Sequence, residues 1–493
     1  MNLAVRTARN TVMVVGARLA SKVLVFVVVL IVIRTMGKDN YGKFTSLIVY
    51  SALTSIVADL GLRPLFTREV AKRRELLSPY LNSILSLKLV LSLPVLGILF
   101  GAVSVGLPEL VPFVLPTFAL LFATSFSNQL RAAFYAMGQL RYEAIAIMAE
   151  SLVLLIGAVA VAVLGLEWWA FIWVYAASYA FTCVFSMVVA ITRLGHRFAF
   201  DLNGARLSML ARESLPFALA FIISTLYFKI DVPILKFFTA GFVAVGIYSA
   251  AYKYLEAVIF LPQTLMDPVF PSLSQLAHEA PERLGGAVTK AYKLLAVVAI
   301  PVMLGMLVFA QPVIDYTIPG FGEAVPVLRV LALGVVFLFV NNVFIYTLNA
   351  MGRQGDSTRL ALFSLVLNVV LNLILIPMPN PLVGGYMGAA WATDLTELGL
   401  FLGGWYLLRR HLYAVPVLRS LKGVLPAGVL CGLAMAAVVL ALGANLPIYV
   451  LALVVGAVVY GGGLMLTHAF SADEVALARE AARSLTSRFP GRA

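Results

Sequence analysis

Charged residues are scarce in this sequence. Asp, Glu, Lys and Arg make up 12% of its 493 residues, whereas a soluble protein has about 25%. Apolar residues make up 62%, and the mean hydropathy is +0.98. A water-soluble fold is excluded because it would leave most of this apolar surface in water, and the same apolar content excludes a disordered or collagen-like chain. We therefore predict an all-α, polytopic membrane protein.

Residues that bind metals or form disulfides are also few. The two cysteines, Cys183 and Cys431, both lie in apolar runs, and the four histidines are scattered. No CxxC or Cys/His spacing is present, which argues against a disulfide framework and a zinc site. The sequence contains no P-loop, GxSxG or HExxH motif. We therefore expect no cofactor, no ATP hydrolysis by this chain and no enzymatic activity.

Fourteen apolar stretches are long enough to cross a bilayer, which takes about 20 mostly apolar residues. The first has no small-residue cleavage site after it and is too long for a signal peptide, so we predict that it is a helix. The predicted spans are residues 11–34, 43–62, 80–106, 110–130, 142–165, 168–192, 214–238, 242–270, 289–314, 326–350, 358–378, 384–408, 421–443 and 447–470.

Positive charges indicate which side of the membrane is cytoplasmic. If both termini lie on one side, that side holds 26 of the 36 Lys and Arg residues, while five lie on the other side and five within spans. We therefore predict a cell-membrane protein with both termini in the cytoplasm. The net charge of +13 then reports topology and does not indicate nucleic acid as a partner. Ser471 and Glu474 form a capping box that begins an amphipathic cytoplasmic tail.

Two pairs of segments indicate an internal repeat of six spans. YAMGQL (135–140) follows the fourth span and NAMGRQ (349–354) the tenth, while GKFTSL (42–47) resembles GIYSAA (246–251). We predict two pseudo-symmetric six-helix lobes plus two C-terminal helices, with a substrate site between the lobes. The predicted domains are an N-lobe at 1–212, a C-lobe at 213–412, the last two spans at 413–470 and the tail at 471–493.

Five cations fall within predicted spans, where burial of each costs about 2.5–3.5 kcal/mol. Two of them, Arg18 and Lys22, are one turn apart on one helix face, where they repel each other unless an anion binds. A phosphate-bearing ligand fits, because Arg offers forked hydrogen bonds and Lys a point charge. Snorkelling or a buried ion pair is the alternative for a lone intramembrane lysine. We predict a cationic substrate cavity lined by Arg18, Lys22, Lys88, Lys229 and Lys253.

Acidic and amide side chains form a second set in the second half. Asn368 and Asn372 are one turn apart, and Asp394 shares a helix face with Glu397. Their oxygen atoms suit hard cations, so Asp231, Asn368, Asn372 and Asp394 are a candidate site for coupling to Na⁺ or H⁺. Hydrogen bonding between neighbouring helices is the alternative for the asparagines. Beyond this Na⁺ we expect no metal.

Two carboxylates in the first half are isolated in the sequence. Asp59 and Glu150 lie within predicted spans, where an unpaired charge is expensive. We expect them to balance Arg18, Lys22 or Lys88.

Six segments along nearly the whole chain resemble a known family. The resemblance is to the polysaccharide transporters of the multidrug/oligosaccharidyl-lipid/polysaccharide (MOP) exporter superfamily, with Met36 standing where that family usually has leucine. It implies fourteen spans and a flippase. In the related lipid II flippases, cations on span 1 contact the diphosphate and spans 7, 11 and 12 hold sodium, which matches the placement of Arg18, Lys22, Asp231, Asn368, Asn372 and Asp394. The segments are IVIRTMGKDNYGKF (31–44), DLGLRPLFTREVAKR (59–73), SLPFALAFIISTLYFKIDVPIL (214–235), VGIYSAAYK (245–253), VFPSLS (269–274) and GGYMGAAWATDLTE (384–397).

We therefore predict a flippase that moves a polyprenyl-diphosphate-linked oligosaccharide to the outer leaflet by alternating access, as a monomer among membrane lipids. Proteins of glycan assembly are candidate partners. The alternatives are a multidrug or organic-cation antiporter on the same fold, a lipid II flippase, and a non-transporting scramblase or scaffold. A polyprenyl-linked sugar polymerase or ligase is disfavoured because the outer loops are too short for a catalytic site.

Overall fold

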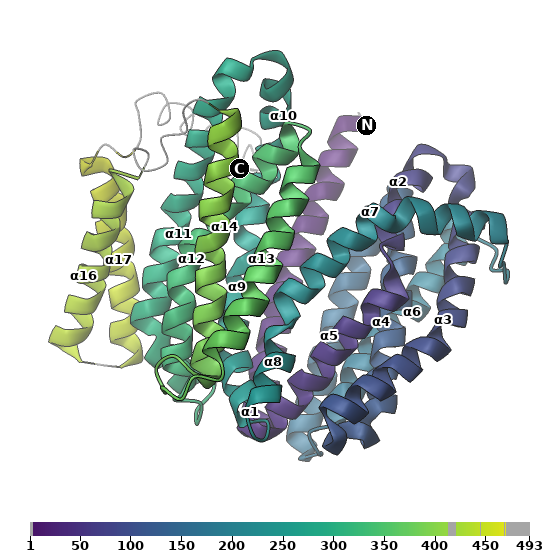
Figure 1. Cartoon of the computed structure of the whole chain (residues 1–493), viewed down its shortest axis with the longest axis horizontal. Helices are drawn as coiled ribbons and strands as arrows, with labels where there is room; N and C mark the ends of the chain where they lie inside the picture. The colour runs from purple at the N-terminus through teal and green to yellow at the C-terminus, as the bar shows by residue number, and fades with distance from the viewer. Residues whose placement is uncertain (1–2, 413–420, 444, 468, 470–493) are drawn as a thin grey trace, which may run out of the picture. The chain divides into compact units, whose positions relative to one another are not determined.

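The computed structural model describes residues 3–412, 421–443, 445–467 and 469. Within them the regular secondary structure is entirely helical (Figure 1), which confirms the all-α prediction. The amphipathic tail that we predict at 471–493 lies outside the described residues.

The helices are long, as expected for apolar runs of this length. In chain order they are α1 (Leu3–Asp59), α2 (Leu62–Lys72), η1 (Arg74–Leu76), α3 (Leu77–Gly106), η2 (Pro108–Phe113), α4 (Val114–Ala136), α5 (Leu140–Leu164), α6 (Ala170–Leu194), α7 (Gly204–Lys229), α8 (Asp231–Phe238), α9 (Val243–Met266), α10 (Phe270–Glu279), α11 (Pro281–Thr317), α12 (Ala324–Ala350), α13 (Gln354–Leu375), α14 (Gly385–His411), α16 (Val424–Leu442) and α17 (Leu446–Leu466).

Twelve of the described helices are long and apolar enough to cross a membrane. The first runs from Met13 to Asp59 and contains two predicted spans, because the backbone at Gly37 is not helical (φ 69°, ψ 177°). Helix α14 is not among the twelve, since Asp394 and Glu397 interrupt its apolar sequence. It nevertheless occupies the predicted range 384–408. The polytopic prediction is thus confirmed, with helix over most of every predicted range.

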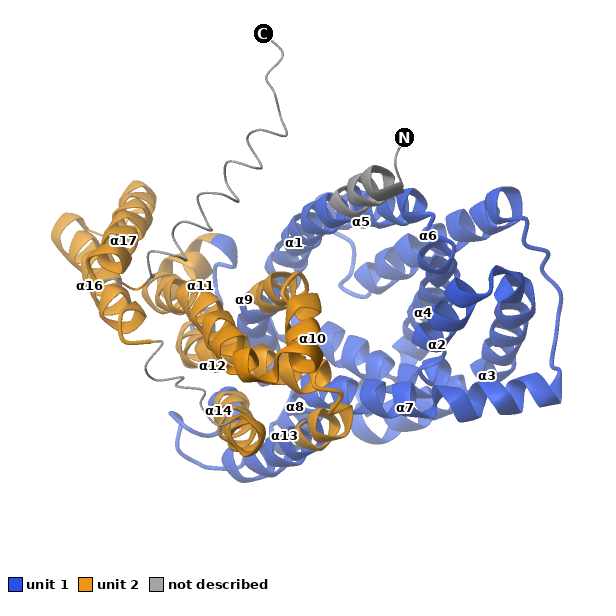
Figure 2. Ribbon diagram, turned by 90° about the horizontal axis from the view of Figure 1, so that it is seen from above, with its two compact units in different colours: residues 1–257, 317–324, 361–392 blue, residues 258–316, 325–360, 393–493 orange. Residues whose placement is uncertain are grey.

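Two compact units make up the described chain (Figure 2). Unit 1 comprises residues 1–257, 317–324 and 361–392, and unit 2 comprises 258–316, 325–360 and 393–493. The units are described separately below. The lobe boundaries near residues 212 and 412 stay a sequence prediction.

The two AMG loops have the same backbone structure, which supports the internal repeat. Each follows the end of a helix, α4 in one case and α12 in the other. Gly138 and Gly352 have φ values of 67° and 73°, the left-handed conformation that favours glycine after a helix. In both loops the amide of the next residue, Gln139 or Arg353, donates to the carbonyl five positions earlier at 2.8 Å.

The second pair of resembling segments meets in unit 1 at its glycines. A Cβ atom on Gly42 would lie 2.0 Å from the carbonyl oxygen of Phe242, and one on Gly246 would lie 2.0 Å from the carbonyl oxygen of Lys38. Each glycine therefore touches the carbonyl four residues before the other glycine. Such a reciprocal contact is what two-fold related surfaces make. Helices α1 and α9 approach so closely because neither has a side chain at this point.

Candidate functional site

Unit 1 contains a cavity of about 660 Å³, which we call the unit 1 cavity. Its volume lies within the range of about 300–1,000 Å³ that is usual for small-molecule sites. Helices α1, α2, α4, α6 and α7 contribute its walls. The lining side chains with polar atoms are Ser51, Ser55, Asp59, Arg63, Thr124, Ser125, Asn128, Gln129, Tyr175, Tyr179, Ser224, Thr225 and Lys229.

Helical spacing explains why these polar residues face one space. On α1 the lining residues Ile48, Ser51, Ser55 and Asp59 follow one another at intervals of three or four residues. On α7 the residues from Phe221 to Phe228 show the same spacing. Side chains at such intervals lie on one helix face. The cavity wall therefore combines polar side chains with apolar ones such as Leu120, Leu121 and Phe228.

One of the five predicted cations is paired at the cavity wall. Lys88 forms an ion pair with Asp59 and donates to Ser125 Oγ at 2.7 Å. Ser125 Oγ also lies 2.6 Å from Asp59 Oδ1. The side chain of Lys88 is 3% exposed and that of Asp59 26%, so only the carboxylate reaches the cavity. The predicted balancing of Asp59 by a nearby cation is confirmed.

Two further predicted cations share one carboxylate. Lys229 Nζ lies 3.0 Å from Glu256 Oε1, and Lys253 Nζ lies 2.6 Å from Glu256 Oε2. Lys229 also lines the unit 1 cavity. The Asp231 carboxylate lines the same small pocket as these three side chains, so ammonium and carboxylate groups are equal in number there.

Arg18 and Lys22 differ from the other three because neither is paired with a carboxylate among the described residues. Arg18 donates to the hydroxyl of Tyr135, and its guanidinium lies 5.6 Å from the centroid of that ring. Ser21 lies between the two cations and joins α1 to α5 through a 2.6 Å hydrogen bond with Ser151. Helix α1 is thus held in place while both cations remain exposed.

Arg63 is a cation of the cavity that the sequence reasoning assigned to a cytoplasmic loop. It lies on α2, lines the cavity, and makes no side-chain hydrogen bond or ion pair with any described residue. The RPLF segment directly after span 2 gave no signal that this arginine faces a cavity.

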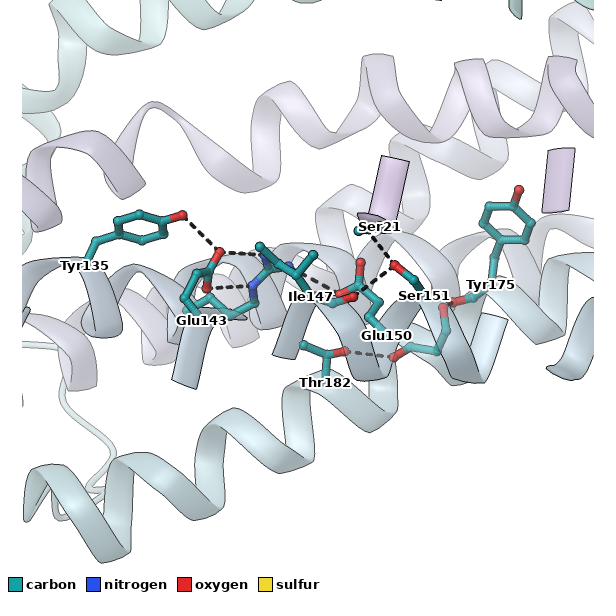
Figure 3. Close-up of polar contacts among 10 residues, drawn as sticks. Ser21, Tyr135, Glu143, Ile147, Glu150, Ser151, Tyr175 and Thr182 are labelled. Atoms are coloured by element: carbon teal, nitrogen blue, oxygen red, sulfur yellow. Dashed lines mark hydrogen bonds and ion pairs between the residues drawn. The ribbon is translucent and has the colours of Figure 1, made fainter. Parts of the chain in front are cut away.

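A closed group of ionic side chains joins α4 to α5 beside Arg18, and we call it the Arg131 cluster. The Arg131 guanidinium binds Glu143 through two hydrogen bonds of 2.7 and 3.0 Å and lies 3.2 Å from Glu150. The Tyr135 hydroxyl, which accepts a hydrogen bond from Arg18, donates to Glu143 at 3.2 Å (Figure 3). The prediction that Glu150 balances Arg18, Lys22 or Lys88 is wrong, because Arg131 is its partner.

Three of the four predicted coupling residues meet in unit 1. Asp231 Oδ1 accepts from Asn372 Nδ2 at 2.9 Å, and Asp231 Oδ2 accepts from the Tyr248 hydroxyl at 2.7 Å. Asn372 Nδ2 also lies 3.1 Å from Asn368 Oδ1. The remaining amide oxygen, Asn372 Oδ1, is buried and accepts no hydrogen bond from any residue that the structure describes. These oxygens form a donor set of the kind that a hard cation prefers.

The fourth predicted coupling residue, Asp394, lies in unit 2. Its neighbour on the helix face, Glu397, accepts from Asn341 Nδ2 at 2.8 Å, and both carboxylates are buried. Asp394 packs against Gly334, where a Cβ atom would lie 2.2 Å from Asp394 Oδ1. Among the described residues no group of three His, Cys, Asp or Glu side chains is placed to hold a metal ion.

Comparison with known families gives a match over more than half of the chain. The polysaccharide biosynthesis protein family matches residues 7–276, and the MatE family matches residues 216–374. Among curated proteins the chain is similar to the "Probable flippase AglR" of Haloferax volcanii, with 28% identity over 174 residues. That match covers 34% of this chain and 35% of the relative, so the chain spans about a third of the relative's length.

Solved structures show the same fold. The lipid II flippase MurJ in an inward closed conformation has a TM-score of 0.71 at 15% identity, covering 92% of this chain and 98% of that one. An inward-facing multidrug resistance MATE family transporter of the MOP superfamily has a TM-score of 0.62 at 15% identity, covering 79% and 95%. The chain therefore belongs to the polysaccharide biosynthesis protein family, as its sequence motifs indicated, and it shares the fold of these two solved transporters.

Proposed function

We propose that the protein flips a polyprenyl-diphosphate-linked oligosaccharide from the cytoplasmic to the outer leaflet by alternating access. The observation that carries this proposal is the pair Arg18 and Lys22, two exposed cations one turn apart with no carboxylate partner among the described residues. Two like charges this close are unfavourable unless an anion binds between them. A diphosphate is an anion of the right charge and shape.

The five predicted cations would then differ in how strongly they bind the diphosphate. Arg18 offers a fork of donors to phosphate oxygens and Lys22 a point charge. Lys88, Lys229 and Lys253 are engaged with Asp59 or Glu256, so they would bind anions less strongly. Such partly engaged cations suit a transporter, which has to release its cargo. The prenyl tail would stay in the lipid, and the positive-inside arrangement of Lys and Arg supports cytoplasmic termini.

Flipping in vesicles tests the proposal directly. The full chain is reconstituted with a fluorescent polyprenyl diphosphate that carries a disaccharide, and the fluorophore reaching the outer leaflet is measured by chemical quenching. Arg18→Ala and Lys22→Ala should each slow flipping at least about tenfold, the effect of losing about 1.4 kcal/mol. Arg34→Ala, which removes an exposed cation from the outer part of α1, is the matched control. Wild-type flipping in both Arg18→Ala and Lys22→Ala would refute the proposal.

The rival functions give different outcomes in the same vesicles. A lipid II flippase would move lipid II and reject the oligosaccharide lipid. A multidrug antiporter would leave both lipids in place and transport an organic cation such as ethidium. A scramblase would flip both lipids without dependence on Arg18 or Lys22.

For coupling, we propose that Asp231, Asn368 and Asn372 hold Na⁺ or a proton. The orphaned Asn372 Oδ1 beside the Asp231 carboxylate supports a cation there. A bound cation would link the transport direction to an ion gradient. Asp231→Asn should abolish the response of flipping to imposed Na⁺ and H⁺ gradients. Transport by the wild-type chain that ignores both gradients would remove this part of the proposal.

A further inference from the structure

We propose that the unit 1 cavity is a sugar-binding subsite, which holds the sugar residues nearest the diphosphate, and that Gln129 is its main hydroxyl-recognising side chain. The inference rests on the proposed function, because it names the part of the substrate that this cavity takes. It assigns the cavity a neutral, hydroxyl-bearing ligand, distinct from the phosphate anion expected at Arg18 and Lys22.

Gln129 is the strongest observation. It lines the cavity, it is only 1% exposed, and neither its Nε2 nor its Oε1 has a hydrogen-bond partner among the described residues. A buried polar group without a partner costs about 1–3 kcal/mol. A primary amide is satisfied by a partner that both donates and accepts. A sugar hydroxyl does both.

Most of the other polar side chains in the wall are also neutral. Hydroxyl and amide side chains such as Ser55, Thr124 and Asn128 face the cavity together with the aromatic rings of Tyr175 and Phe221. A pyranose has hydroxyls around its rim and apolar C–H faces, so amides can meet the rim while aromatic rings cover a face. A prenyl chain would leave these polar groups unsatisfied, which costs free energy.

The charges of the cavity favour a sugar next to a phosphate over an organic cation. Its one lining carboxylate, Asp59, is engaged by Lys88 and Ser125. Two lining cations remain, and one of them, Arg63, has no ion pair among the described residues. A cationic drug would meet net positive charge here. A sugar joined to a diphosphate would place its anionic end within reach of Arg63.

Binding of two lipids to the purified full chain tests the subsite. The probes are a polyprenyl diphosphate bearing an N-acetylhexosamine disaccharide and the same lipid diphosphate without sugar. Gln129→Leu should weaken binding of the glycosylated lipid at least about tenfold and leave binding of the bare lipid unchanged, because only the hydroxyl contacts are lost. Gln311→Leu, which removes an amide from an exposed position of α11, is the control and should change neither affinity.

Cysteine protection gives a second measurement that does not depend on Gln129 variants folding. Ser224→Cys places a thiol on the cavity wall, and Thr67→Cys places one on α2 outside the lining. The glycosylated lipid should slow maleimide labelling at residue 224 more than the bare lipid does, with no difference at residue 67. The background from the native cysteines is measured in the unaltered chain.

The outcomes separate this inference from the function it rests on. Equal losses for both lipids in Gln129→Leu, or equal protection of residue 224 by both lipids, would overturn the sugar subsite and leave the flippase intact. Failure of the unaltered chain to bind either lipid would overturn the proposed function, and the subsite with it.

Discussion

Two buried polar residues of α4 lie two positions apart and have opposite surroundings. Arg131 is enclosed by Glu143 and Glu150, which satisfy its guanidinium through the Arg131 cluster. Gln129 is more deeply buried, yet neither polar atom of its amide has a partner within the described part of the chain. Residues two apart point to different helix faces, so one face of α4 forms structure and the next faces the unit 1 cavity.

The presence or absence of partners within the chain distinguishes polar side chains that stabilise the fold from those that bind a ligand. Where every partner is supplied by the chain, removal of one member leaves an unpaired buried charge and destabilises the fold. Where partners are missing, removal changes ligand binding. We therefore expect that, among the ion pairs of unit 1, the loss of folding free energy on removing one partner is larger where the pair is less accessible to water.

The Arg131 cluster should give the largest effect on stability. Arg131→Leu leaves the buried Glu143 carboxylate and the partly buried Glu150 carboxylate without their cation, so we expect a loss of about 3–5 kcal/mol in folding free energy. Thermal unfolding in detergent, together with the yield of monodisperse protein, measures it. Arg141→Leu removes an exposed arginine of α5 and should change the unfolding temperature little. Equal unfolding temperatures for the two variants would show that the cluster does not hold α4 and α5 together.

The Lys88–Asp59 pair should give an intermediate and asymmetric effect. Asp59→Asn leaves the nearly inaccessible ammonium of Lys88 with only neutral acceptors, at a cost of about 1–3 kcal/mol. Lys88→Met should cost less, because the Asp59 carboxylate keeps its bond from Ser125 and reaches the cavity. The unfolding temperatures of the two variants test this prediction. A lower unfolding temperature for Lys88→Met than for Asp59→Asn would contradict it.

A half-buried pair between the linker before α7 and the first turn of α7 should give the smallest effect, because water reaches both of its side chains. Asp201 accepts from Ser83 and pairs with Arg206, and these contacts lower its pKa below the usual value. A carboxyl whose pKa is lower in the folded state stabilises the fold above its unfolded pKa of about 3.9 and loses this contribution as the pH falls through its folded pKa. Asp201→Asn should therefore lower the unfolding temperature slightly at pH 7. The difference in unfolding temperature between the wild-type chain and Asp201→Asn should vanish in acid. A difference that grows as the pH falls would contradict the stabilising role of the Asp201 carboxylate.

The positions of the spans were predictable because each span is a long apolar run that can be recognised from its own residues. The break at Gly37 separates two runs that hydropathy alone resolves, and the AMG loops mark corresponding helix ends. Helix α14 shows the limit, because Asp394 and Glu397 lower its hydropathy while tertiary packing buries them. Its identification from sequence depended on the length of its apolar run, which two acidic residues do not end.

The site was predictable only in part, because pairing depends on which helices are neighbours. Lys253 and Glu256 are three apart on one helix, so their contact follows from helical geometry. Glu143 and Glu150 are also seven residues apart on one face, but the partner Arg131 lies on another helix at the edge of a predicted span. Sequence reasoning placed that arginine in a loop. Gln129 carries no charge, and nothing in its neighbourhood distinguishes it from a residue packed between helices.

The reciprocal glycine contact has a consequence for biosynthesis. The backbone around Gly42 cannot make its contact with the segment around Gly246 until that segment has been synthesised, roughly 200 residues later. At about 5–20 residues per second, that interval lasts roughly 10–40 seconds. During it the early part of the chain would sit in the membrane with an uncovered backbone groove. A chaperone or the insertion machinery that shields this groove would be needed most in that interval.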